Sequence, residues 1–410
     1  MINSPLFSRS GLLSMSRRHR VLILAVALVG VGLRLGAMLF GSNFDYDSYE
    51  VVGELQSDGE NVYAWTGRYN YGPAWFLLLG QFWRLSQALV GDAGLFRIQV
   101  VLILIAADLV IAYLLLRRLG PVAATLMLLS PVSILITGFH NQFDNIAIAV
   151  GFAAILLIGN AKEGAIDGRQ MTGIALLGLS IIFKHVLFFL PLWMGLRQRT
   201  WRRGIAVVMI PWVLFAVSFL PWIYDGWWGI YDNVIKYRSF SNAPLVDALT
   251  LGLLDADALG TVGFVVFIAA ILVVGWWVRG QDHVTAFLVM LGAMVIFAPA
   301  MANQFLTIPV AAVAAFPSAL LGIWTLGGTW HLVGDSDGLG FSGILPPFLD
   351  RAEMGTAVHI APVLVLAAGG WHWFRRLRTQ RVAPAPRTVD VAPTDTVRPP
   401  PTSLRSATSP

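Results

Sequence analysis

Two aspartates separated by a single residue, Asp45 and Asp47, directly follow the first long apolar run of this 410-residue chain. A carboxylate at such a position can accept the proton of a hydroxyl group as that hydroxyl attacks another atom. In an extended linker both carboxylates can reach one site, and together they can bind a divalent cation such as Mg²⁺ or Mn²⁺. A solvated loop carboxylate is the alternative for each residue alone. The acidic residues that follow, Glu50, Glu54, Asp58 and Glu60, are predicted to form the solvated face of a short helix.

The next candidate residues, Arg68, Tyr69 and Tyr71, lie in an aromatic segment that ends in Gly72-Pro73. Tyrosine rings at a membrane interface often serve only as anchors. They also stack on sugar rings, and the planar guanidinium of an arginine matches the geometry of a phosphate. We therefore predict that these three side chains bind substrate.

Two further polar segments interrupt apolar sequence. His140, Gln142 and Asp144 fall within the dense run FHNQFDN at residues 139–145, although Asp144 can also simply cap the helix that follows. Lys184 and His185 lie between two short apolar runs, where a lysine either extends to the surface or lines a cavity between broken helices. Polar groups at membrane depth are costly and often functional, so we predict that these residues also bind substrate.

Basic residues also occur where a membrane topology should be poor in positive charge. Lys236 and Arg238 follow a Trp-rich segment that we predict to lie outside, and such a departure favours an anion such as a phosphate. Gln304 adds an amide between two apolar runs and is the weakest candidate.

The elements that carry these residues are predicted to be membrane helices. Apolar residues make up 57% of the chain and charged residues 12%, and the mean hydropathy is +0.70. Several apolar runs approach the ~20 residues that cross a bilayer, where backbone groups must bond within a helix. The absence of cysteine excludes disulfides and thiolate metal sites. The net charge of +5 comes from arginine clusters beside apolar runs, which indicate topology rather than a nucleic-acid partner.

Charge distribution predicts an all-α polytopic protein with about twelve crossings (ten to thirteen) and with both termini in the cytoplasm. Residues 1–19 form a cytoplasmic tail, 20–379 the transmembrane domain and 380–410 a disordered tail. Residues 73–90 are predicted to be an amphipathic helix on the outer surface, within a long first outer loop. The crossings are expected near residues 20–40, 98–116, 120–138, 146–159, 172–183, 186–196, 204–222, 258–278, 284–300, 304–316, 317–333 and 355–373.

Four motifs in this order resemble the GT-C superfamily of integral-membrane glycosyltransferases. DYDSY at 45–49 with RYNYGP at 68–73 is similar to the first outer loop of the catalytic subunit of the GPI mannosyltransferase. FHNQFDN, FKHVLFFLP at 183–191 and NQFLTIP at 303–309 resemble motifs of transferases that use dolichyl-phosphate sugars. Archaeal and bacterial polyprenyl-phosphate-sugar transferases are comparably similar. The chain departs from the pattern at Asn141, where the family has glycine, and in the short interval from Tyr49 to Gly59.

The resemblance implies a GT-C-like fold in the plasma membrane and transfer of a hexose, such as mannose, with inversion. The donor would be a polyprenyl-phosphate sugar and the acceptor a lipid-linked or envelope glycan at the outer face. It implies that Asp45, or else Asp47, is the base, and that Lys184, Lys236, Arg238 or Arg68 stabilises the leaving phosphate. A divalent cation is compatible with the family but is not required by it.

Two other classes of protein remain alternatives. A transporter or flippase of a lipid-linked sugar predicts ionisable residues buried along a path to both faces, and Asp108 is the clearest mid-span charge. A non-catalytic partner in an envelope-polymer complex would not need polar residues concentrated on one face.

Overall fold

Apolar residues without strand-like alternation form helices throughout the computed structural model, which describes residues 16–159, 166–236, 243–334 and 357–382. These residues contain no strand, so the all-α prediction is confirmed. The first half comprises α1 (Arg17–Met38), α2 (Phe44–Ser57), α3 (Val62–Trp65), α4 (Pro73–Val90), α5 (Phe96–Leu119), α6 (Pro121–Leu128), α7 (Pro131–Leu135), η3 (Ile136–His140), α8 (Asp144–Ile158) and α9 (Gly168–Phe183). The second half comprises η4 (His185–Leu187), α10 (Leu190–Gly195), α11 (Trp201–Val217), η5 (Leu220–Trp222), α12 (Ile223–Ile230), η6 (Tyr231–Ile235), α13 (Pro244–Leu249), α14 (Ala256–Val278), α15 (His283–Ile296), η7 (Asn303–Thr307), α16 (Val310–Ala315), α17 (Ala319–Gly334) and α19 (Ala357–Val382).

Several of these helices are suited to a membrane. Among the described residues, four helices are long and apolar enough to cross a bilayer, or five if one bent pair counts as a single span. The four are Arg17–Met38, Phe96–Leu119, Trp201–Ile235 and Ala256–Val278. Other apolar helices, such as α8, α9 and α15, are shorter than 18 residues. The prediction that the chain contains membrane-spanning helices is thus confirmed, while the number of about twelve crossings stays a prediction.

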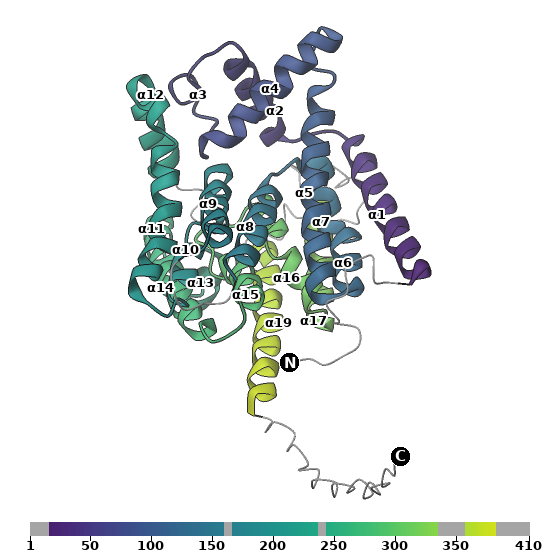
Figure 1. Cartoon of the computed structure of the whole chain (residues 1–410), viewed down its shortest axis with the longest axis vertical. Helices are drawn as coiled ribbons and strands as arrows, with labels where there is room; N and C mark the ends of the chain where they lie inside the picture. Colours follow the sequence, from purple (N-terminus) through teal and green to yellow (C-terminus); the bar gives the residue numbers. More distant parts are fainter. Residues whose placement is uncertain (1–15, 160–165, 237–242, 335–356, 383–410) are drawn as a thin grey trace, which may run out of the picture. The chain divides into compact units, whose positions relative to one another are not determined.

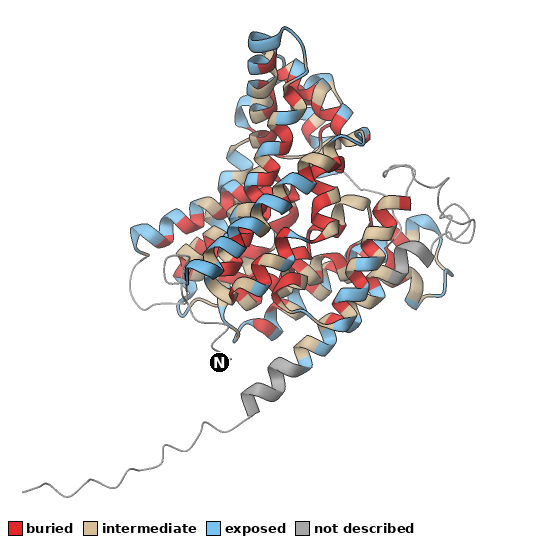
Figure 2. Ribbon diagram, turned by 90° about the vertical axis from the view of Figure 1, so that its right-hand side faces the viewer, coloured by how far each residue is buried: buried red, intermediate tan, exposed pale blue. Residues whose placement is uncertain are grey.

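The main unit, Met1–Gly370, holds the core, and a second unit begins at Trp371 within α19. In the main unit, α2, α3 and α4 gather at one end beside α12, while α8 packs between α9 and α5 (Figure 1). Buried residues concentrate in the interior of the bundle and exposed residues on its outer helices (Figure 2). The predicted amphipathic helix at 73–90 forms as α4 with those bounds and packs against α2.

A buried ion pair joins α1 to the helices behind it. The Arg34 Nε atom donates to Asp108 Oδ2 at 2.8 Å, and each residue is only 1% exposed. Other guanidinium nitrogens donate to the Ser133 hydroxyl at 2.7 Å and to the Leu128 carbonyl at 2.8 Å. Because a charge without water must be paired and fully bonded, this arginine fixes the distances between α1, α5, α6 and α7.

The Asp108 carboxylate is bonded equally well. The hydroxyls of Thr137 and Ser133 donate to its Oδ2 atom at 2.7 and 3.0 Å, and the Asn145 amide donates to Oδ1 at 3.0 Å. These donors come from α7, η3 and α8. Asp108, the mid-span charge noted in the sequence, is therefore neutralised by Arg34 and joins several helices.

The crossing predicted at 120–138 is broken rather than continuous. Helix α6 ends at Leu128, and α7 continues into η3 at an angle of 44° after a short break. Pro131 starts the second helix because it has no N–H to donate, and the Ser130 hydroxyl accepts from the Ser133 N–H as a cap. The released Leu128 carbonyl accepts from Arg34 instead.

The Trp-rich segment that we predict to lie outside is helical over most of its described residues between 223 and 247. Helix α12 and η6 extend α11, and α13 follows from Pro244. The contact with α3 accounts for this: the Asn61 side chain donates to the Trp222 carbonyl at 3.0 Å and also to the Asp225 carboxylate. Gly229 lies against the Tyr63 carbonyl, where no larger residue fits.

The two predicted tails lie largely outside the described residues. Helix α1 begins at Arg17, slightly earlier than predicted, and α19 extends to Val382. The predicted tails at 1–15 and 383–410 lie outside the described ranges.

The Arg34–Asp108 pair predicts a strong coupling in a double-mutant cycle. Arg34→Met or Asp108→Leu alone leaves a buried charge without its partner, which we expect to cost about 3–5 kcal/mol of unfolding free energy. The double variant should lose less than the sum of the two. Equilibrium unfolding in mixed micelles measures the cycle, and additive losses would contradict the account.

Candidate functional site

The first residue of the candidate site is placed by the N-terminus of α2. The Asn43 side chain caps this helix by accepting from the Tyr46 N–H, and its amide donates to His140 Nδ1 at 2.9 Å. Asp45 is half-buried in the first helical turn and Asp47 is exposed. The expected extended linker is therefore absent, and residues two apart on a helix point in different directions.

The geometry of α2 separates the two residues of the predicted metal site. Because α2 directs Asp45 and Asp47 apart, the two carboxylates do not converge as a chelating pair. Across the described part of the chain, no group of three or more His, Asp or Glu side chains is arranged to hold a metal ion. The residues present thus do not fit a divalent cation bound by this pair.

The second group of site residues follows η3. Gly138 lies so close to α1 that a Cβ atom there would be 2.3 Å from the Arg34 carbonyl. Asn141 then reverses the chain in the left-handed region (φ 56°), and its side-chain amide donates to the Thr137 and Gly138 carbonyls at 3.0 and 2.9 Å. Asparagine tolerates this conformation better than most residues. The turn presents Gln142 toward α2.

Gln142 connects an acid to a cation. Its Nε2 atom donates to Asp45 Oδ2, and its Oε1 atom accepts from the Lys184 ammonium at 3.3 Å. Both ends of the amide are therefore assigned by charged neighbours. The hydrogen bond from Gln142 fixes the orientation of the Asp45 carboxylate.

Lys184 itself is buried, with 5% of its surface exposed. Its ammonium lies 2.6 Å from Asp144 Oδ2 and faces the rings of Phe143 and Tyr71 at 4.6 and 4.9 Å from their centroids. Such surroundings stabilise a cation away from water. The break after α9 delivers this lysine because the chain is extended there (φ −152°, ψ 129°).

Several buried polar atoms around this cluster have no hydrogen-bond partner within the described parts of the chain. They are the Tyr49 hydroxyl, His185 Nδ1 and Asp144 Oδ1. The Tyr49 ring packs against Phe143 and Trp75, and burial together with the nearby Asp45 raises the pKa of the Tyr49 phenol well above its ordinary value. Tyr49 thus offers a neutral hydroxyl, and these atoms supply unused hydrogen-bonding capacity beside the acid.

Other predicted residues lie near this cluster with different surroundings. Arg68 is exposed, and its guanidinium lies 4.8 Å from the ring centroid of Phe44, which precedes Asp45. Tyr71 packs against both Phe143 and His185. Tyr69 is buried with its hydroxyl bonded to the Gly72 carbonyl, so it shapes the loop as a packing residue.

Two predicted residues with described positions are not brought into the cluster. Lys236 is 69% exposed in its side chain and lies 4.0 Å from Asp232 of its own helical turn. Gln304 is half-buried in η7, which packs against η3. Among the described residues, no hydrogen bond or ion pair joins either side chain to Asp45, Gln142 or Lys184. Arg238 lies outside the described ranges.

The sequence analysis missed two residues that hold the site together. Arg97 donates to the Gly41 carbonyl and to Asn141 Oδ1, so it ties the α1–α2 connection to the turn after η3. An arginine at the start of an apolar run has no sequence signal that separates this role from a topology marker. Asn43 had a readable signal, because an asparagine before Asp45 fits the pattern of a helix N-cap.

Comparisons of the chain with family models, with curated proteins and with solved structures each gave no match. The function must therefore be inferred from the geometry of the cluster formed by Asp45, Gln142, Lys184 and Asp144.

Removing the buried cation should affect the fold far more than removing an exposed one. In Lys184→Met the Asp144 carboxylate stays buried without its partner, so we expect a loss of about 3–5 kcal/mol in unfolding free energy. Lys236→Met is the matched control, with an expected change of about 0–1 kcal/mol. Equal changes for the two variants, measured by unfolding in micelles, would contradict the role given to Lys184.

Proposed function

We propose that this protein is a membrane glycosyltransferase that moves a hexose, such as mannose, from a polyprenyl-phosphate sugar to a lipid-linked or envelope glycan. One observation carries the proposal. The Asp45 carboxylate is half-buried and bonded to Gln142, whose other end meets the buried Lys184–Asp144 pair. Such an acid, held in one orientation beside unused hydrogen-bonding groups, suits a general base that activates a hydroxyl.

The proposed reaction is a single displacement with inversion. The acceptor hydroxyl oxygen forms a bond to the anomeric carbon of the donor, and the bond from that carbon to the phosphate oxygen breaks. The acceptor proton passes to Asp45, and the electron pair of the broken bond leaves with the polyprenyl phosphate. A fixed carboxylate lowers the barrier because its orientation is set before the acceptor arrives.

The leaving phosphate gains negative charge, so a cation must be available to it. Arg68 suits this role because its guanidinium is exposed beside the first turn of α2. Lys184 is committed to Asp144 and Gln142, so we assign it to positioning Asp45 through the Gln142 amide. Lys236 and Arg238 remain candidates for binding the donor phosphate in the same proposal.

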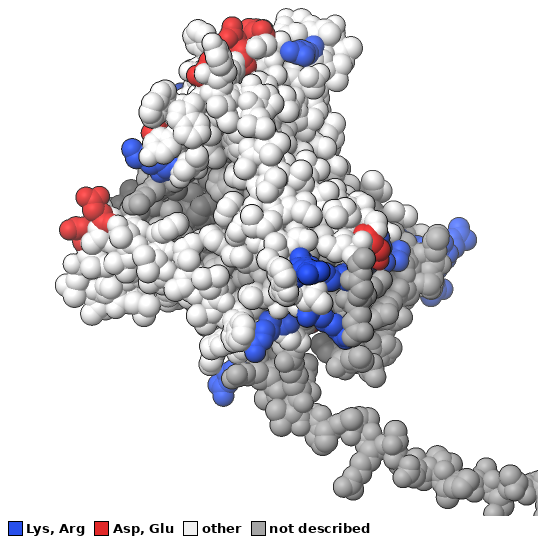
Figure 3. Space-filling model, turned by 60° about the vertical axis from the view of Figure 1, so that its left-hand side comes forward, with Lys and Arg blue, Asp and Glu red and all other residues white. Residues whose placement is uncertain are grey.

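We place this chemistry at the outer face of the plasma membrane, in a GT-C-like bundle of about twelve crossings with both termini inside. The bent pair formed by α6 and α7 with η3, the shorter apolar helices α8, α9, α10, α15 and α16, and the helices α17 and α19 would supply the additional crossings. In Figure 3, most basic side chains of this face lie in its lower part, and charged side chains of both signs lie at the top and along the left edge. A broad uncharged surface lies between the top and the lower basic group, and it supports a membrane at that level.

The geometry of Asp108 favours a transferase over a transporter. A transport path needs ionisable groups that a substrate or proton can reach. Asp108 is instead bonded to Arg34, Thr137 and Asn145 and is 1% exposed. Uptake of a lipid-linked sugar by vesicles without any sugar transfer would reverse this preference.

Neutralising one of the two aspartates should abolish activity, while neutralising the other should not. Asp45→Asn removes the proton acceptor, so we expect transfer from a polyprenyl-phosphate hexose to fall by about 10²–10⁴-fold. Asp47→Asn is the matched control on the same helical turn, and we expect it to retain most activity. Mass spectrometry of the products formed by each purified variant measures this, and full transfer by Asp45→Asn would refute the proposal.

Membrane topology can be tested directly because the chain contains no cysteine. A membrane-impermeant maleimide should label Glu60→Cys in intact spheroplasts, because that exposed residue follows α2 on the outer face. Arg199→Cys should react only after the membrane is permeabilised. The reverse pattern would place Asp45 at the inner face.

A further inference from the structure

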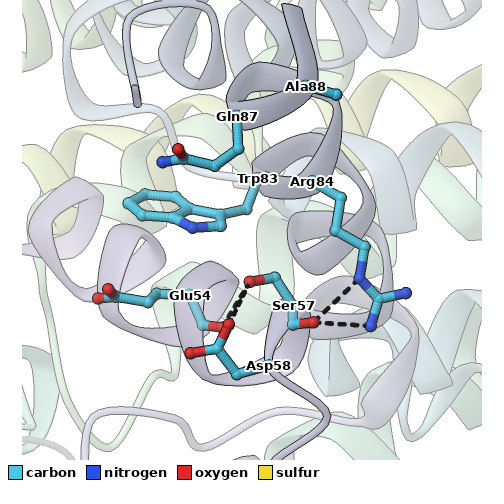
Figure 4. A pocket seen from close by; sticks show the side chains of 7 residues that line it. All are labelled: Glu54, Ser57, Asp58, Trp83, Arg84, Gln87 and Ala88. Carbon is cyan, nitrogen blue, oxygen red and sulfur yellow. Dashed lines mark hydrogen bonds between the residues drawn. The ribbon is translucent and has the colours of Figure 1, made fainter. Parts of the chain in front are cut away.

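A hollow of about 660 Å³ lies between the C-terminal end of α2 and the middle of α4, on the surface of the main unit. It is lined by Glu54, Ser57, Asp58, Trp83, Arg84, Gln87 and Ala88. Figure 4 shows the Trp83 ring extending across the hollow, with the Gln87 amide on one side and the Glu54 and Asp58 carboxylates on the other. None of these residues belongs to the cluster around Asp45.

The walls of the hollow are held in place by the protein. The Arg84 guanidinium donates to the Ser57 carbonyl at 2.9 and 3.1 Å and to the Gln56 carbonyl at 3.2 Å, which joins α4 to the end of α2. The Trp83 ring meets the Phe96 ring edge-on at 5.3 Å. The Ser57 hydroxyl donates to Asp58 Oδ1 at 3.1 Å. The aromatic surface and the polar groups are therefore partly fixed before any ligand binds.

The charges decide which class of ligand fits. Two carboxylates disfavour an anion such as a phosphate, and the Arg84 guanidinium in the same wall disfavours a metal cation. An exposed tryptophan face packs against an apolar surface, while carboxylates and an amide bond to hydroxyl groups. A neutral sugar residue presents both a C–H face and hydroxyl groups, so its chemistry matches the hollow.

The position of the hollow relates it to the reaction. Asp47, Glu50, Glu54 and Asp58 recur at helical spacing and form one stripe along α2. Asp47 and Asp58 are eleven residues apart, which is roughly 16 Å along a helix. The stripe thus leads from Asp47 to the hollow. Asp45 lies in the same first turn of α2 but points in a different direction. A long acceptor can contact both places, whereas a single sugar cannot.

We propose that this hollow binds a neutral hexose residue of the acceptor glycan, several units away from the hydroxyl that reacts. The acceptor is then an oligosaccharide or polysaccharide rather than a single lipid-linked sugar. This inference rests on the proposed function for its link to transfer, but sugar binding in the hollow can be measured without transfer.

Binding is tested on the purified full-length protein carrying Asp45→Asn, so that turnover does not intervene. The probes are neutral tetrasaccharides of mannose, glucose and galactose and the matching monosaccharides, observed by saturation-transfer NMR. We expect at least one tetrasaccharide to bind, and Trp83→Ala to weaken its binding about tenfold. Gln87→Ala and Asp58→Asn should also weaken the binding. Because they change exposed side chains, they keep the test valid if the tryptophan variant misfolds.

Matched controls are Trp228→Ala, another exposed tryptophan, and Glu60→Gln, an exposed acid outside the hollow. Both should bind the tetrasaccharide as the parent does. The inference is overturned if no tetrasaccharide binds, if Trp83→Ala, Gln87→Ala and Asp58→Asn bind normally, or if Mg²⁺ alone occupies the hollow and is lost in Asp58→Asn. A protein that binds the tetrasaccharide through Trp83 but never transfers a sugar would refute the proposed function alone.

Discussion

The Arg34–Asp108 ion pair is the interaction on which the arrangement of helices depends. A guanidinium and a carboxylate that are both 1% exposed persist only when every strong hydrogen-bonding group is matched. Here the partners come from α1 and from the five consecutive elements α5, α6, α7, η3 and α8. This pair therefore specifies which helices are neighbours and in what register they pack. Apolar contacts alone specify this poorly in lipid.

The candidate site is an extension of that junction toward one end of the bundle. Thr137 binds Asp108 through its hydroxyl and Asn141 through its carbonyl, so the buried pair and the turn after η3 share a residue. The turn then supplies Gln142 to Asp45, while Arg97 fastens the same turn to the start of α2. The buried Arg34–Asp108 pair thus fixes the turn that orients Asp45. This explains how a residue in the first turn of α2 can be held in place.

Much of this architecture could be predicted from the sequence, and the failures have physical causes. The bounds of α4 and the helical character of the chain follow from local patterns. The grouping of Asp45 with Gln142 and Lys184 was instead an expectation from the resemblance of their motifs to one class of transferases. The partner of Asp108 could not be predicted, because Arg34 lies inside an apolar run and pairing over 74 residues leaves no local trace. The helix at 223–235 was not predicted, because its Gly and Asp residues locally prefer other conformations. Contacts with Asn61 and Tyr63 override that preference.

The stereochemistry of the product tests the central claim most directly. The purified protein would be incubated with a polyprenyl-phosphate hexose of known anomeric configuration and an oligosaccharide acceptor, and the anomeric configuration of the product would be read by NMR. The account predicts transfer with a single inversion, because Asp45 activates the acceptor and no covalent sugar intermediate forms. A product with retained configuration, or movement of the donor across the membrane without any transfer, would contradict it.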